Sequence, residues 1–101
     1  MGNVTFIKIR RDPPEGSILA FEGRQAWTLA ALIDAGSKGI TPIERPAPRW
    51  SQYVFLLRQA GLEIETVRQA HGGSYPGRHG RYVLWTPIEV LEIAGHRSDA
   101  A

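Results

Sequence analysis

Three prolines, Pro42, Pro46 and Pro48, interrupt the middle of the 101-residue chain and most constrain how it can fold. Proline disfavours helical geometry in the residue before it, so no long helix can cross this segment. Residues 41–44 (Thr-Pro-Ile-Glu) nevertheless form a helix-start pattern, because threonine can cap free amides, proline suits the first helical position, and the glutamate can bond back. We therefore expect a very short helix at residues 41–45.

A longer helix is expected before this break. Residues 23–35 are rich in helix formers, and they place Ala26, Leu29 and Ile33 on one face. Gly36 follows as a C-terminal stop.

Another helix is expected after the break, because Pro48 can itself open a helix and residues 49–60 contain no breaker before Gly61. At 100° per residue, Trp50, Val54 and Leu57 share one stripe, which we expect to face the core. The opposite side carries both polar and apolar side chains.

Two segments after this helix have the alternation of β-strands. Residues 62–67 and 81–86 each alternate with a period of two, which predicts a hairpin. Their connection, residues 71–80, contains four glycines and a proline and is longer than a tight turn requires. Such length suggests a function at the tip.

The chain ends are expected to add small elements to this middle part. Residues 4–10 are β-branched and aromatic and predict a strand, closed by a loop at residues 11–16. Residues 86–89 (Thr-Pro-Ile-Glu) repeat the helix-start pattern and favour a short helix through Ile93, although alternation also permits a strand there. The expected division is a strand and loop over 1–21, a central domain over 22–86, and a short helix and tail over 87–101.

Composition narrows the functional classes. No apolar run approaches the roughly 20 residues of a membrane span, and the start of the chain lacks the pattern of a secretory signal, so we expect a cytoplasmic protein without membrane contact. There is no cysteine, and no carboxylate lies between residues 65 and 89 to assist His71 or His79. We expect no cofactor, no metal and no catalysis.

Charge is unevenly distributed along the chain. Residues 45–88 hold six arginines and two glutamates, whereas the remainder holds six basic and eight acidic residues. A basic block on a mildly acidic scaffold indicates a surface that binds phosphate groups, with chance scatter of surface arginines as the alternative.

The order of these elements resembles the winged helix-turn-helix family over residues 22–86, and in particular the small phage-type and bacterial members. The resemblance is carried by Leu57-Arg58-Gln59-Ala60-Gly61 with Ile64 behind it, and by the glycine-rich loop from His71 to Tyr82. It implies an α+β fold of three helices and a β-hairpin wing, here with an extra N-terminal strand.

The resemblance also implies a DNA-binding site. Residues from Pro48 to Ala60 would enter the major groove of double-stranded DNA, and the wing at 71–81 would lie on the backbone or in the minor groove. Gln52 suits adenine, Arg49 suits guanine or a phosphate, and Ser51 suits a phosphate oxygen. The full set of candidate DNA-contacting residues is Arg45, Arg49, Ser51, Gln52, Phe55, Arg58, Gln59, His71, Arg78, His79 and Arg81.

Protein binding is the alternative to DNA binding, and the oligomeric state is a separate question. Phe55 and Leu56 lie where a DNA-reading helix usually carries polar residues, so they could contact thymine methyl groups or mark a protein-binding adaptor. A homodimer on DNA is also expected, through residues 5–10 or 88–93. The sequence does not distinguish transcription regulation from an architectural role.

Overall fold

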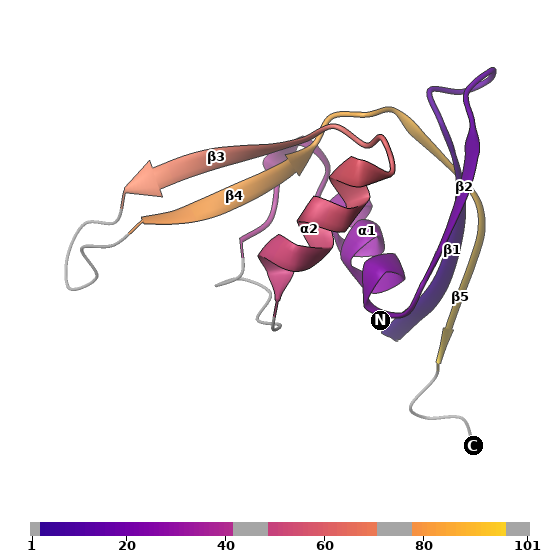
Figure 1. The fold of residues 1–101 in the computed structure, drawn as a ribbon, viewed down its shortest axis with the longest axis horizontal. Coiled ribbons are helices and arrows are strands. Elements are labelled where there is room, and N and C mark those ends of the chain that lie inside the picture. Colours follow the sequence, from indigo (N-terminus) through magenta and orange to yellow (C-terminus); the bar gives the residue numbers. More distant parts are fainter. Residues whose placement is uncertain (1–2, 42–48, 71–77, 97–101) are drawn as a thin grey trace.

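The computed structural model describes residues 3–41, 49–70 and 78–96 of the chain. In order, its elements are β1 (Asn3–Arg11), β2 (Ile18–Glu22), α1 (Gly23–Ala35), a single-turn 3₁₀-helix (Gly36–Lys38), α2 (Trp50–Gln59), β3 (Ile64–Ala70), β4 (Arg78–Leu84) and β5 (Ile88–His96). The two α-helices lie at the centre, with a three-stranded sheet on one side and a hairpin reaching away on the other (Figure 1). The fold is α+β, as the sequence predicts.

Strands β2, β1 and β5 form an antiparallel sheet, in that spatial order, against the helices. On its inner face, Ile7 and Ile9 of β1 and Phe21 of β2 are buried together with α1. The predicted N-terminal strand is thus confirmed. It belongs to the same hydrophobic core as the rest of the chain.

The two long helices have the positions that the sequence predicts. Of the face expected on α1, Ala26 and Leu29 are buried, whereas Ile33 is only half-buried. Helix α1 ends at Gly36, where a φ of 59° and an N–H donated to the carbonyl of Leu32 close the last turn. Helix α2 buries Trp50, Val54 and Leu57, the predicted stripe.

The predicted hairpin is confirmed as the antiparallel pair β3 and β4, in a register that places Ile64 opposite Leu84 and Thr66 opposite Tyr82. Its base is joined to the segment after α1, because Ile40 and Tyr82 exchange two backbone hydrogen bonds of 3.0 and 2.9 Å. The Tyr82 ring also stacks on Trp50 at 6.0 Å between ring centroids. The hairpin is therefore attached both to α2 and to the chain that leaves α1.

One expectation about secondary structure is wrong, and another falls outside the described residues. Residues 88–96 form strand β5 and not a short helix, because Ile93 pairs with Ile7 and Val90 with Ile9 along an edge of β1. Pairing with β1 satisfies the backbone N–H and C=O groups of this segment. This tertiary effect outweighs the local helix-start pattern. The described residues also contain two α-helices and not three, since the short helix expected at residues 41–45 falls almost wholly on 42–48, outside the described residues.

Strand β2 was not anticipated, because the sequence analysis expected a single strand at residues 4–10 and a loop in the rest of the 1–21 segment. No helix in the described part of the chain has the length and apolar character to cross a membrane.

Candidate nucleic-acid interface

The face of α2 opposite the core carries most of the helix residues that the sequence singled out. Ser51, Gln52, Phe55, Arg58 and Gln59 are all exposed. The structure therefore brings these five predicted residues onto one helix surface. Their role on DNA stays a prediction.

Apolar area on this surface is concentrated at one residue. Phe55 is 53% exposed, whereas its neighbour Leu56 is only half-buried and so contributes less to the outer face. An exposed phenylalanine beside two glutamines gives the helix one apolar contact point among amide groups that both donate and accept hydrogen bonds.

The start of α2 is shaped by an unusual backbone conformation. Arg49 precedes the helix with a φ of 67°, a left-handed conformation that is uncommon outside glycine, and its side chain is exposed. The first turn of the helix contains no acidic residue. Positive charge at Arg49 and the free amides of the first turn together make this end of the helix attractive to an anion.

Arg58 has a structural task that the sequence did not reveal. Its Nε and Nη2 donate to the backbone carbonyl of Ile64 at 2.9 and 2.6 Å, and Nη2 also donates to the Thr66 hydroxyl at 2.8 Å. The guanidinium therefore connects the last turn of α2 to the first residues of β3. Thr66, which no sequence pattern identified, is the side-chain partner in this connection.

Arg81 holds the other strand of the hairpin. Its Nη1 donates to the carbonyls of Lys38 and Gly39 at 3.2 and 3.4 Å, and the residue is half-buried. The carbonyl acceptors lie at the end of the 3₁₀-helix, next to Ile40, which pairs with β4. Arg81 thus reinforces the base of the hairpin. Lys38, whose carbonyl accepts one of these bonds, is exposed and is a basic residue that the sequence analysis missed.

One glycine of the hairpin has a packing reason. A Cβ added to Gly80 would lie 2.7 Å from Cγ2 of Thr66, so a larger residue at this position would displace the side chain that accepts a bond from Arg58. Close approach within the protein therefore accounts for Gly80.

For the remaining predicted site residues, no side-chain contact is described. Arg45 and His71 lie outside the described residues. Arg78 and His79 begin β4 and pair with Ala70 and Gln69, and only their backbone positions are described.

Comparison with known proteins agrees with this geometry. The model of a family described as a winged helix domain matches residues 18–94. No curated protein and no solved structure matches the chain. The match begins at β2 and includes most of β5, so it extends on both sides beyond the 22–86 region of the sequence-based resemblance. With two packed helices, a hairpin attached to the second, and a family match over three quarters of its length, the chain belongs to the winged helix domain family.

Proposed function

We propose that this protein binds double-stranded DNA, with the exposed face of α2 in the major groove and the β3–β4 hairpin on the sugar-phosphate backbone or in the minor groove. The observation that most supports this proposal is the composition of the α2 surface. An α-helix with its side chains is about 10 to 12 Å in diameter and fits the major groove, which is about 12 Å wide, and the ten residues of α2 extend over about 15 Å. Its outer face offers Gln52 and Gln59 for base edges, with Arg49 and Ser51 at the end where phosphates would pass.

Each side chain has a role in this proposal that follows from its chemistry. Gln52 forms paired hydrogen bonds with adenine, Arg49 binds guanine or a phosphate, and Phe55 packs on a thymine methyl group. The basic residues of the hairpin neutralise phosphates and contribute affinity without reading sequence. In this proposal the protein acts in the cytoplasm as a binding module and not as an enzyme, in transcription regulation or in an architectural role.

The proposal is tested by titrating labelled random-sequence duplex with the protein at several salt concentrations. Affinity must fall steeply as salt rises, because binding that neutralises phosphates releases counterions. Arg49→Ala should weaken binding, whereas Lys8→Ala removes the same charge from the outer face of the sheet and should leave affinity unchanged. Binding that is absent, or equally affected by both substitutions, would exclude α2 as the DNA-binding surface.

A protein-binding adaptor is the second candidate, and the exposure of Phe55 is the observation that favours it. An interface centred on an apolar ring should hold or strengthen as salt rises, opposite to DNA binding. The same salt series with a captured protein partner therefore distinguishes the two functions. Homodimer formation is also part of this proposal.

A further inference from the structure

Strand β5 is an open edge of the three-stranded sheet. Within the described residues it pairs with β1 alone, so the backbone groups on its other side face away from the sheet. Residues 88–96 contain no proline and no lysine, two residue types that commonly protect such edges, and the protection that the strand does carry is one bulge and two glutamates. Glu89 and Glu92 lie 3.7 and 3.8 Å from Arg10 and Lys8 of β1, which offsets their charge locally.

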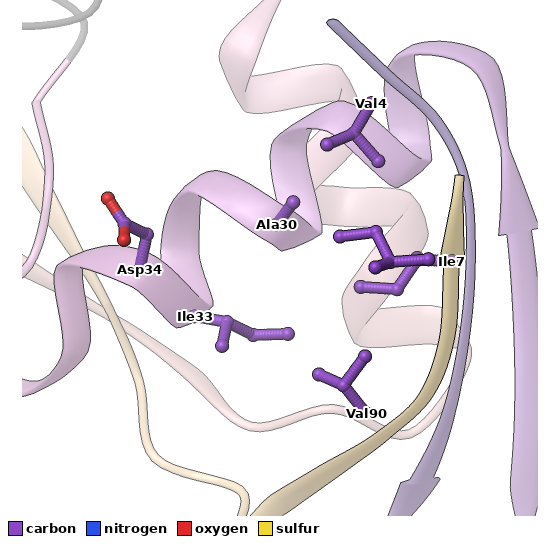
Figure 2. A pocket seen from close by; sticks show the side chains of 7 residues that line it. Val4, Ile7, Ala30, Ile33, Asp34 and Val90 are labelled. Atoms are coloured by element: carbon purple, nitrogen blue, oxygen red, sulfur yellow. The ribbon is translucent and has the colours of Figure 1, made fainter. Parts of the chain in front are cut away.

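An apolar groove of about 210 Å³ runs along the inner side of this edge, between β5 and α1. Figure 2 shows Ile33 of α1, Ile7 of β1 and Val90 of β5 around this space. Val90 and Ile93 line the groove and remain 41% and 53% exposed. These two side chains are apolar surface that the described residues leave partly uncovered.

An irregularity in β5 gives the strand a symmetric arrangement of faces. The pairing with β1 passes from Lys8–Glu92 to Ile9–Val90, so Leu91 is an extra residue, a β-bulge. The bulge is the reason that Val90 and Ile93, three residues apart, both face the groove. On the outer face, Glu89 precedes this pair and Ala94 follows it.

Counted outward from the point between Leu91 and Glu92, the strand therefore has matching faces in both directions, because Val90 and Ile93 face the groove and Glu89 and Ala94 face outward. We infer that β5 is the interface for a second copy of this chain, which pairs with it antiparallel about a two-fold axis through that point. Val90 of one copy then lies opposite Ile93 of the other, and Glu89 lies opposite Ala94.

Charge and side-chain direction both select this register. Moving the strands by one residue would set groove-facing side chains opposite outer-facing ones, which a pleated sheet does not allow. Placing the axis on Glu92 or on Glu89 would set two identical carboxylates directly opposite each other, which is destabilising. A second copy is the occupant that this palindromic pattern fits, and the two sheets would become one.

The size of the contact predicts a weak dimer. A strand of nine residues is about 30 Å long, and with side chains on both faces spanning about 10 Å it covers roughly 300 Å² per copy. Stable complexes bury roughly 800 Å² per partner. Joining the two grooves adds apolar area, but self-association should still depend on protein concentration.

The register is tested by disulfide formation between two variants, Val90→Cys and Ile93→Cys, in a chain that has no cysteine of its own. Directly opposite side chains have Cβ atoms about 5 Å apart, close to disulfide geometry, whereas like positions in the two copies are offset by three residues, about 10 Å. On mild oxidation, a mixture of both variants should give a mixed dimer in larger yield than either variant alone. Phe55→Cys, equally exposed on α2, serves as the control partner.

A mixed dimer no more abundant than the one between Ile93→Cys and Phe55→Cys would overturn the inference. Sedimentation equilibrium supplies a second measurement that needs no cysteine. The wild-type protein should show rising mass with concentration, and Ile93→Lys, a change at an exposed side chain, should remain a monomer with unchanged thermal unfolding. Equal masses for both proteins at every concentration would also refute the interface. Neither measurement includes DNA, so the result does not depend on the proposed function.

Discussion

Arg58 in the last turn of α2 donates a 2.8 Å hydrogen bond to the hydroxyl of Thr66 in β3. Two further bonds from the same guanidinium reach the Ile64 carbonyl. The helix proposed to enter the major groove and the hairpin proposed to lie on the backbone are therefore joined directly. These bonds set the orientation of the hairpin relative to the helix before DNA is present, so binding costs less conformational entropy.

This connection predicts a stability effect for a residue that looks like a surface arginine. Arg58→Ala should lower the free energy of unfolding by about 1 to 3 kcal/mol, because it removes hydrogen bonds from a charged donor to a partly buried carbonyl. Thr66→Val should cost less, and Thr66→Ser, which keeps the hydroxyl, should be nearly neutral. Urea denaturation measures all three, with Gln59→Ala as an exposed control on the same turn. Equal effects of Arg58→Ala and Gln59→Ala would show that the guanidinium contributes nothing to the fold.

Gln52→Ala should change sequence preference and leave nonspecific affinity nearly intact. Base contacts specify the site whereas phosphate contacts position the protein, and a bidentate amide contact discriminates by about 1 to 3 kcal/mol at one base pair. Selection from a randomised duplex pool, followed by sequencing, identifies the position that loses its preference. If specific and nonspecific affinity fall together, Gln52 does not read a base.

Phe55 should recognise thymine through its methyl group. Replacing thymine by uracil in a preferred site removes that methyl group and should weaken binding of the wild-type protein, whereas Phe55→Ala should bind both duplexes equally. The substitution should hardly affect folding, because the ring is 53% exposed. A uracil effect that persists in Phe55→Ala would assign the methyl contact to another residue.

Arg78 and Arg81 are expected to contribute affinity through charge. Replacing both by alanine should weaken binding to all duplexes alike and reduce the salt slope by about two, near one for each lost phosphate contact. Arg81 also contributes to stability, because it donates to the carbonyls of Lys38 and Gly39. Arg81→Ala should therefore lower the unfolding free energy by itself, by about 1 kcal/mol. Binding that keeps its salt slope in the double variant would show that the hairpin does not touch the phosphates.

Local sequence patterns were sufficient to predict the elements that depend on residues close to one another in the sequence. The stripe of Trp50, Val54 and Leu57 and the stop at Gly36 follow from helical periodicity and backbone preference, and both helices appear where these signals place them. Alternation likewise identified the hairpin, because one face of each strand had to meet the core.

The sequence by itself thus determined two amphipathic helices, a hairpin and the family resemblance, since each rests on periodicity over a few residues. Only the tertiary structure decided that residues 88–96 are a strand, because the hydrogen bonds that stabilise β5 come from β1, some eighty residues away. It likewise decided that Arg58 and Arg81 brace the hairpin, because the carbonyls they bond are brought close only by folding. Charge can be counted along a chain, but whether a guanidinium meets solvent or a backbone carbonyl depends on which segments pack beside it.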